Sequence, residues 1–352
     1  MRPTPAVTHS DPSGAPSAPR FVVLGLGRSG LAWAMAVAQH QEGALAGLVE
    51  PRTPLRRFAK GAGFTVPAFA TLEQFLAKHT CDAAIVSGPQ EDRVAAIESA
   101  VRAGLAVLVD GLPVLHAEGA SRIEGAMSGA RAPVGCGIGL LFHPLFARAA
   151  SVLGAAGLGE LREIRASVYV SRVFAADVPP ERGDVLDFAV AELLVLLDAM
   201  FGPALAVSGT GQRLYGSRLD EVHAQLKLAN GREAVVDGSW SVPGYPRASV
   251  VVEVVAERGA LLVSDDALEA DLPEPCEGLP AGHSRRVLAD ELETTTFESG
   301  ETTRPLAAFA SSLPSGPLLD ALDPRRALRV ARLLDALRRS AAEGGKEREV
   351  AS

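Results

Sequence analysis

A glycine-rich segment near the amino terminus, Gly25-x-Gly27-x-x-Gly30, constrains the fold more than any other feature of the sequence. It follows the short apolar run Phe21 to Leu24, which is typical of a strand buried on both faces. An alanine-rich stretch through about Gln39 comes next and predicts a helix. A strand, this glycine pattern and a helix in direct succession indicate a dinucleotide-binding βαβ unit. A glycine-rich turn without a ligand is the alternative.

Each glycine of the segment has a distinct expected role. Gly25 makes the tight turn, Gly27 lets the backbone approach a pyrophosphate, and Gly30 permits close packing of helix on strand. The helix that follows would offer unpaired N–H groups and a partial positive charge to the phosphates. We therefore expect the whole turn to contact the cofactor: Gly25, Leu26, Gly27, Arg28, Ser29 and Gly30.

An acidic residue, Glu50, ends the second predicted strand, about 20 residues after the last glycine, as this motif requires. Its carboxylate could accept hydrogen bonds from the adenosine ribose hydroxyls and would repel a 2′-phosphate, which favours NAD. Arg52 lies close by and could hold such a phosphate instead. The sequence thus predicts NAD, with NADP as the alternative.

The rest of the chain separates into two regions with different patterns. Up to about residue 142, strands at 44–49, 83–86 and 106–109 alternate with helices, which predicts a parallel sheet. Beyond it, a helix at 185–201 precedes long alternating strands, with Asn230-Gly231 as a turn between antiparallel neighbours. An amphipathic helix, 324–340, closes the chain. The expected fold is α/β: a Rossmann parallel sheet, then an α+β domain with an open, mostly antiparallel sheet.

These patterns also set the expected domain limits. Residues 1–20 are rich in Pro, Ser and Ala, lack the apolar core of a secretory signal, and are expected to be a disordered extension. Residues 21–142 would form the dinucleotide-binding domain, 143–343 a substrate and oligomerisation domain, and 344–352 a tail. The acidic stretch 265–305 carries no pattern that places it.

Composition excludes several classes of function. The 352 residues carry 34 Lys+Arg against 42 Asp+Glu, a net charge of −8, which does not suit a nucleic-acid partner. No apolar run is long enough for a membrane span. Three scattered cysteines, Cys81, Cys136 and Cys276, suit neither a disulfide framework nor a metal site. A cytoplasmic protein with no metal is expected.

Three segments resemble the glucose–fructose oxidoreductase / inositol dehydrogenase (Gfo/Idh/MocA) family. They are "CDAAIVSGPQEDRVAAIESAVRAGLAVLVDGLP", "FHPLFARAASVLGAAGLGELREI" and "DPRRALRVARLLDALRRSAAEGG", in the family's order. The resemblance covers almost all of the chain after residue 20. It implies NAD(P)-dependent chemistry on a sugar-like, cyclitol or other small substrate. It also implies a homo-oligomer formed through the sheet of the second domain.

The resemblance further implies cofactor contacts from the loops after two strands. These are Ser87, Gly88 and Pro89 after one strand, and Asp110 after the next, where the family carries a glutamate. The family's usual catalytic positions differ here, however. Its lysine corresponds to Leu112, and its Rossmann-domain histidine to Arg93.

The family's Asp-x-x-x-His pair on the second-domain helix also lacks its histidine. One register gives Asp187 and Ala191, and the other gives Phe188 and Glu192. Glu192 is the leading replacement for proton transfer, because its apolar neighbours would disfavour the ionised carboxylate; a surface glutamate is the alternative. Asp187 could serve instead, or simply complement the helix dipole. His143 could shuttle a proton, or be a packed boundary residue.

Two functions remain compatible with this pattern. The first is an NAD(P)-dependent oxidoreductase that transfers a hydride to or from a small carbonyl, imine or hydroxyl substrate with an atypical acid–base set. The second is a catalytically inactive relative that binds dinucleotide and acts as a regulatory or partner protein. Intact cradle glycines fit both. The altered catalytic positions do not separate the two functions, whereas a measurement of turnover does.

Overall fold

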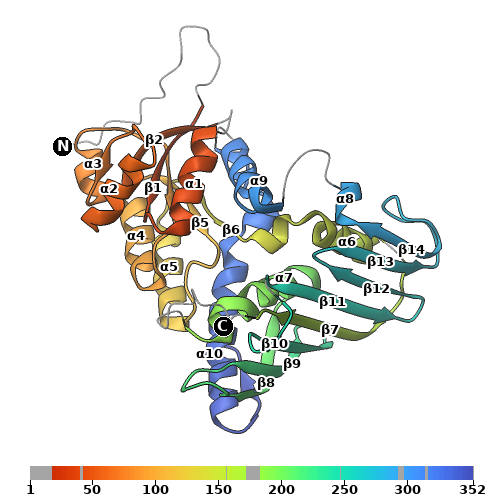
Figure 1. The fold of residues 1–352 in the computed structure, drawn as a ribbon. Helices are drawn as coiled ribbons and strands as arrows, with labels where there is room; N and C mark the ends of the chain where they lie inside the picture. The colour runs from red at the N-terminus through yellow and green to blue at the C-terminus, as the bar shows by residue number, and fades with distance from the viewer. Residues whose placement is uncertain are drawn as a thin grey trace.

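The computed structural model describes residues 18–39, 43–155, 157–171, 183–245, 247–291, 297–313 and 316–351. Most of the expected extension, residues 1–17, lies outside this range. The described chain forms two β-sheets with helices packed on them (Figure 1). This confirms the predicted α/β class, with a parallel sheet first and a mostly antiparallel sheet second.

The first sheet has six parallel strands in the order β3-β2-β1-β4-β5-β6. This is the order of a dinucleotide-binding Rossmann fold. The strands are β1 (Arg20–Leu24), β2 (Ala44–Val49), β3 (Ala68–Phe69), β4 (Ala83–Val86), β5 (Ala106–Asp110) and β6 (Val134–Gly137). The predicted strands 44–49 and 83–86 have these bounds.

Helices cover both faces of this sheet, which is why its strands are apolar without alternation. Val22 and Leu24 face a core that includes α3, α4 and α5, whereas Phe21 and Val23 face one that includes α1 and α2. The helices are α1 (Arg28–Gln39), α2 (Thr53–Gly61), α3 (Leu72–Leu76), α4 (Gln90–Arg102) and α5 (Ala117–Ser128). The strand order reverses between β1 and β4, because β2 and β3 lie on one side of β1 and β4 to β6 on the other, and this opens a crevice at the carboxyl ends of β1 and β4.

The second sheet has nine strands in the order β14-β13-β12-β11-β7-β10-β9-β8-β15. Neighbours are antiparallel except β7 and β10, which run parallel. The strands are β7 (Leu161–Tyr169), β8 (Ala204–Gln212), β9 (Glu221–Leu228), β10 (Glu233–Ser239), β11 (Ser249–Ala256), β12 (Gly259–Ser264), β13 (Ala267–Leu272), β14 (Gly282–Val287) and β15 (Arg348–Glu349). The turn at Asn230-Gly231 joins β9 to β10 as predicted, with the positive φ of 78° at Gly231.

One face of this sheet is covered by helices and the other is open. Alternation along β9 shows it, because Val222, Ala224 and Leu226 are buried while the residues between them are exposed or half-buried. The covering helices are α6 (Pro144–Ala155), α7 (Ala191–Phe201) and α10 (Pro324–Ala342). Short α8 (Leu288–Glu291) follows β14. Among the described residues, no helix combines the length and apolar composition that crossing a membrane requires.

Two late segments pack back on the first sheet. Helix α9 (Phe297–Ser312) lies beside α1, and its Leu306 and Phe309 are buried in the same core as Trp33 (Figure 1). Helix α10 contacts α5 of the first region and α7 and β8 of the second. The two sheets are therefore joined by contacts made by the carboxyl-terminal part of the chain.

The predicted helix 185–201 forms, but it does not begin as a regular α-helix. Residues Leu186–Val190 make a π-helical turn that leads into α7. Such turns are uncommon and occur often at functional sites. The extra residue in this turn changes which side chains share a face, so the two alternative sequence registers do not map simply onto one helical surface.

Candidate functional site

The turn between β1 and α1 has the backbone geometry that its glycines predict. Gly25 has a φ of 93°, and a Cβ there would lie 2.7 Å from the backbone of Gly88. A Cβ on Gly30 would overlap the carbonyl oxygen of Gly25. A Cβ on Gly27, in contrast, would meet no atom within 4 Å. Two glycines are thus required for packing, while the third borders open space where a phosphate group fits.

Helix α1 begins at Arg28, directly after this open position. The Leu31 N–H donates to the Gly27 carbonyl, 3.0 Å away. The amides of Arg28, Ser29 and Gly30 therefore form the first helical turn, where N–H groups have no intrahelical acceptor. Together with the helix dipole, these groups favour an anion at Gly27.

Glu50 ends β2 with a fully buried carboxylate, at 0% exposure. Its Oε2 accepts hydrogen bonds from the Leu26 N–H at 2.8 Å and from Arg52 Nη2 at 3.0 Å. Its Oε1 accepts from the Arg52 N–H at 2.9 Å and from Arg52 Nε at 2.7 Å. Burial alone would raise the pKa of Glu50, but these hydrogen bonds hold it below its usual value. Glu50 is therefore ionised at neutral pH and tied to the glycine turn.

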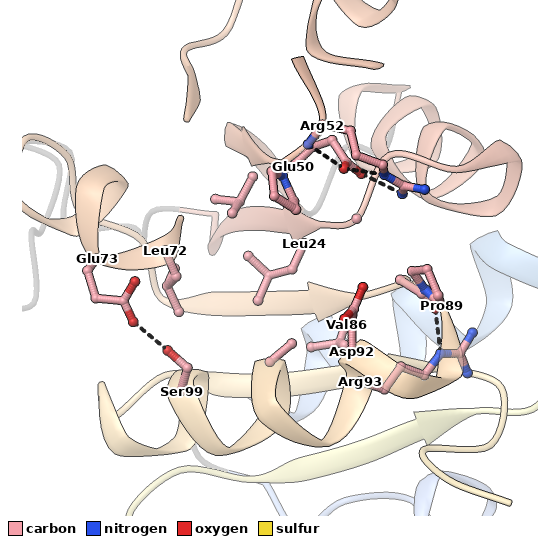
Figure 2. Close-up of a pocket in the computed structure, with 15 residues that line it drawn as sticks. Leu24, Glu50, Arg52, Leu72, Glu73, Val86, Pro89, Asp92, Arg93 and Ser99 are labelled. Carbon is pink, nitrogen blue, oxygen red and sulfur yellow. Dashed lines mark hydrogen bonds and ion pairs between the residues drawn. The ribbon is translucent and has the colours of Figure 1, made fainter. Parts of the chain in front are cut away.

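A cavity of about 270 Å³ lies at the carboxyl ends of β1, β2 and β4 (Figure 2). Its walls come from the turn at Gly25, from Glu50 and Arg52, and from Leu72 of α3 and Ala96 of α4. It combines a mostly apolar lining with a carboxylate and a guanidinium at one edge. That combination suits a purine and its ribose.

Asp110, at the end of β5, joins three elements of this edge. One carboxylate oxygen accepts hydrogen bonds from the hydroxyls of Ser29 and Ser87, each at 2.6 Å. The predicted cofactor residues of α1, β4 and β5 are therefore brought together. Pro89 and Gly88 follow Ser87 into the wall of the cavity.

Arg93 on α4 is a partly buried cation that fixes the same loops. Its Nε donates to the Gly88 carbonyl at 2.8 Å, and its Nη1 donates to the carbonyls of Asp110 and Leu112 at 2.7 and 2.6 Å. Burial lowers the pKa of Arg93, and the negative charges of Asp110 and Glu192 oppose that change. Sequence reasoning identified Arg93 only as a replaced histidine. Its position in the first turn of α4, near the cofactor loops, was the available signal.

Glu192 faces the tight turn that Arg93 holds. Gly111 has a φ of 68°, and Glu192 Oε1 lies 3.6 Å from the place a Gly111 Cβ would occupy. Glu192 is half-buried in the first turn of α7. Leu112, which the resemblance predicts to replace the family's lysine, is 5% exposed and packs in the core. The carboxylate at this turn therefore comes from the second region of the chain.

Asp187 takes part in a different set of contacts. Arg338 of α10 donates to Asp187 and, at 3.0 Å, to the Leu115 carbonyl. Asp335, one turn earlier on α10, accepts the Ala117 N–H at 2.6 Å. Burial raises the pKa of Asp187, with Arg338 acting in the opposite direction. This arrangement connects the π-helical turn, α10 and the loop before α5.

His143 lies at the start of α6, 4% exposed, with its ring 5.1 Å from that of Phe146. Burial lowers its pKa to about 4, and the nearby charge of Arg304 acts in the same direction. Its imidazole is therefore neutral at pH 7. A hydrogen bond with the backbone of Asp265 and the charge of Asp266, both before β13, act in the opposite direction.

The residues of the first sheet fit a dinucleotide by their own chemistry. An open position at Gly27 beside a helix amino terminus suits a diphosphate, and Glu50 at an apolar cavity suits an adenosine. Arg52 lies at the same edge, where a guanidinium can distinguish a ribose hydroxyl from a ribose phosphate. Among the described residues, no group of three or more His, Cys, Asp or Glu side chains could hold a metal ion.

Comparison with known proteins agrees with this geometry. Residues 19–130 match the model of the Gfo/Idh/MocA family, described as the oxidoreductase family with an NAD-binding Rossmann fold. The predicted resemblance is therefore confirmed for residues 19–130, and this region has the NAD-binding Rossmann fold of that family. No curated protein sequence matches the chain.

Solved structures share the fold along nearly the whole chain. An oxidoreductase from Agrobacterium radiobacter, solved with NAD+, L-tartaric acid and magnesium, superposes with a TM-score of 0.82 at 15% identity, covering 95% of this chain and 99% of its own. GenD2 from gentamicin A biosynthesis, solved with NAD, gives 0.77 at 20% identity and covers all of both chains. Levoglucosan dehydrogenase, solved with NADH, gives 0.80 at 14% identity, covering 95% and 99%.

Proposed function

We propose that this chain, whose first domain has the NAD-binding Rossmann fold of the Gfo/Idh/MocA oxidoreductases, is an NAD-dependent oxidoreductase acting on a sugar-like substrate. The observation that carries the proposal is the geometry of the first turn. Gly27 borders open space at the start of α1, and Glu50 is held beside it by the Leu26 N–H. Bound NAD supplies the hydride acceptor or donor, and the protein must position one substrate carbon and manage one proton.

Residues of the first sheet hold the cofactor in this proposal. The amides of Arg28 and Ser29 face the diphosphate, and Glu50 faces the adenosine ribose. Asp110 keeps Ser29 and Ser87 in place through two hydrogen bonds of 2.6 Å. These contacts fix α1 relative to the ends of β4 and β5, so the cleft is shaped before any ligand enters.

Glu192 is the group that moves the proton. Its carboxylate faces Gly111, in the loop that Arg93 holds through the Asp110 and Leu112 carbonyls. A carboxylate here could take a proton from a substrate hydroxyl on oxidation, or return one on reduction. Asp187 and His143 are assigned structural roles, because Arg338 binds Asp187 and burial keeps His143 neutral.

Several features support a small polyhydroxylated or related substrate. Levoglucosan dehydrogenase has been solved with levoglucosan and with L-sorbose, and GenD2 comes from gentamicin A biosynthesis. These proteins share the fold of this chain at 14–20% identity. A cyclitol, an anhydrosugar or a keto-sugar is the class we propose to test first. An imine or an activated ketone would need less acid–base assistance.

The open face of the second sheet is the proposed surface for homo-oligomer formation. It carries exposed or half-buried aliphatic residues at its centre, including Val235, Val251 and Leu262. Charged side chains surround them, which fits a specific contact more than an aggregation surface. The three cysteines are free thiols, which supports a reducing, cytoplasmic setting.

A catalytically inactive relative that binds dinucleotide is the second candidate. It is favoured by Leu112, which puts a core side chain at the family's lysine position. It is also favoured by the ion pair that engages Asp187.

The experiment that separates the candidates starts with purified protein and NADH, followed by nicotinamide fluorescence. Turnover is then screened on cyclitols, anhydrosugars and keto-sugars, with NAD+ or NADH as required. The oxidoreductase predicts saturable binding and turnover of at least one class. Binding without turnover across the screen supports the inactive relative, and no binding contradicts both.

A further inference from the structure

We infer that Arg93 is a positioning residue for the proton transfer assigned to Glu192, because its guanidinium fixes the turn Asp110-Gly111-Leu112 against which the Glu192 carboxylate lies. The inference rests on the proposed function, since it concerns the chemical end of the same cleft. It goes beyond that function by giving a part in the chemistry to a side chain of α4 that acts only through another residue.

The first step of the argument is the shape of this turn. Gly111 has a φ of 68°. The carbonyls of its two neighbours, Asp110 and Leu112, both accept a hydrogen bond from Arg93 Nη1, at 2.7 and 2.6 Å. Two carbonyl dipoles that point to one place repel each other, and a positive charge between them removes that repulsion. Arg93 therefore stabilises this turn over other shapes of the same loop.

The second step concerns the loop after β4, to which the same guanidinium is bound. Arg93 Nε donates to the Gly88 carbonyl at 2.8 Å (Figure 2). One planar side chain, 13% exposed, thus fixes the turn relative to the wall of the cofactor cavity. A lysine has a single nitrogen on a flexible stem and cannot span both loops in this way. Gln90 also donates to the Leu112 carbonyl, but over 3.3 Å and with a neutral amide, so it can replace little of what Arg93 provides.

The third step connects the turn to Glu192, which approaches it from α7. Glu192 Oε1 lies 3.6 Å from the place that a Gly111 Cβ would occupy, which is an ordinary van der Waals distance. The negative charge of Glu192 also acts on the Arg93 guanidinium, so the cation and the carboxylate attract each other. A displacement of the turn toward α7 would meet the carboxylate, and a displacement away would open a gap in front of it. The position of the turn therefore sets the position of Glu192.

The fourth step is the sensitivity of the reaction to this geometry. When a substrate alcohol is oxidised, the hydride leaves its carbon for the bound coenzyme and the hydroxyl proton leaves for Glu192, so that a carbonyl remains. The proton is transferred efficiently only within hydrogen-bond reach, about 2.6–3.2 Å between the heavy atoms. A misplacement of about 1 Å can lower the rate about 100-fold. Loss of Arg93 should therefore lower kcat far more than the affinity for NADH, because the glycine turn and Glu50 keep their contacts.

The test measures kcat, KM and the NADH dissociation constant of the full-length protein. The substrate is the one that turns over fastest among cyclitols, anhydrosugars and keto-sugars, beginning with myo-inositol and levoglucosan. Arg93→Met removes the charge and the donors but keeps an unbranched side chain, whereas Arg93→Lys keeps the charge. We expect kcat to fall about 100-fold in Arg93→Met and about 10-fold in Arg93→Lys, with the NADH dissociation constant changed by less than about tenfold.

The matched control is Arg102→Met, which makes the same change in the last turn of the same helix, where the side chain is exposed. Its kcat, KM and NADH dissociation constant should equal those of the wild type. Urea unfolding of each variant confirms that it is folded.

A double variant distinguishes positioning from a general effect on the fold. In a protein that carries Glu192→Gln the proton acceptor is absent, so Arg93 has no carboxylate left to position. Adding Arg93→Met should then lower kcat by less than about threefold beyond Glu192→Gln alone. A purely structural role of Arg93 would lower kcat by the same factor in both backgrounds.

The remaining outcomes separate this inference from the proposed function. If the wild type binds no NADH, or turns over no substrate, the proposed oxidoreductase fails and the inference with it. If the wild type is active, the inference alone is overturned when Arg93→Met keeps its kcat, loses it equally in both backgrounds, or loses no more than Arg102→Met. It is also overturned if Glu192→Gln keeps the wild-type kcat, or if neither Arg93 variant folds, because Arg93 would then serve the fold and not Glu192.

Discussion

The two ends of the proposed cofactor cleft each carry a glutamate, Glu50 at one end and Glu192 at the other, and the two side chains are held in different ways. Glu50 is completely enclosed, and backbone amides from its own turn and from the glycine turn hold it. Glu192 is half-buried and faces a loop from the other region of the chain, across Gly111. The binding end is therefore built from one βαβ unit, whereas the chemical end requires both regions to be in place. Changes at the first end that leave the fold intact should affect cofactor binding and not turnover, and changes at the second should affect turnover and not cofactor binding.

The largest effects are predicted for two glycines of one turn, whose substitution by alanine should have different consequences. Gly30→Ala places a methyl group on the Gly25 carbonyl oxygen, a backbone atom that cannot move aside. We expect a loss of several kcal/mol of folding free energy, or no folded protein, as for other severe overpacking. Gly27→Ala meets open space, so the protein should unfold like the wild type yet bind NADH at least about tenfold more weakly. Chemical denaturation and NADH titration measure the two effects. Equal stability of both variants would contradict the packing argument.

The next effect is on turnover. Glu192→Gln keeps the size of the side chain and removes its ability to exchange a proton. With any substrate found in the screen, we expect kcat to fall by about 10²- to 10⁴-fold with the NADH dissociation constant unchanged. Asp187→Asn is the matched control, because it removes a carboxylate one helical turn earlier. A smaller loss in Glu192→Gln than in Asp187→Asn would transfer the proton role to Asp187.

A pH-dependent effect on stability is expected from His143. Its pKa is lowered to about 4 by burial, so below pH 6.5 the unfolded chain binds a proton that the folded protein refuses. Stability should fall by about 3 kcal/mol as the pH drops from about 7.5 to about 4, and this contribution should change no further below that. In urea unfolding over the same pH range, the His143→Gln variant should lose about 3 kcal/mol less stability than the wild type. Exposed His223 provides the control, as His223→Gln. If the stability of the wild type and of His143→Gln depended on pH in the same way, the prediction would be contradicted. The His143 ring would then contact solvent in the folded protein.

The smallest effect concerns the contact between the two regions. Arg338→Met removes the partner of Asp187 and the donor to the Leu115 carbonyl. Both charged side chains are partly exposed, so we expect a loss of about 1–2 kcal/mol of stability. NADH affinity should be unchanged, because no residue of the glycine turn is involved. A loss of NADH binding would show that the two ends of the cleft are not independent.

The first sheet could be predicted closely because its determinants are local. The run Phe21 to Leu24, the glycines and Glu50 are adjacent in sequence to the structure they form. The acidic stretch 265–305 could not be placed, because its strand β13 is defined by pairing with β12, and β14 by pairing with β13. Helix α9 contains Pro305, which is unfavourable inside a helix, and its buried residues pack on α1, far away in sequence.

The candidate site divides in the same way. The roles of Gly25, Gly27 and Gly30 follow from strand, turn and helix alone. The role of Arg93 in holding the loops was not predicted, since its three carbonyl partners come from two loops that only the tertiary fold brings together. Arg338 was not identified either, because it lies in α10, many residues after the Asp187 that it binds. The π-helical turn, which no residue pattern indicates, separates Asp187 from Glu192 in their contacts.

A crystal structure of the protein grown with saturating NADH would show how the dinucleotide lies in this cleft. We expect the diphosphate against Gly27 and the amino terminus of α1, the adenosine ribose at Glu50, and the nicotinamide on the side of Gly111 and Glu192. A dinucleotide bound elsewhere, or one whose nicotinamide points away from Glu192, would contradict this expectation.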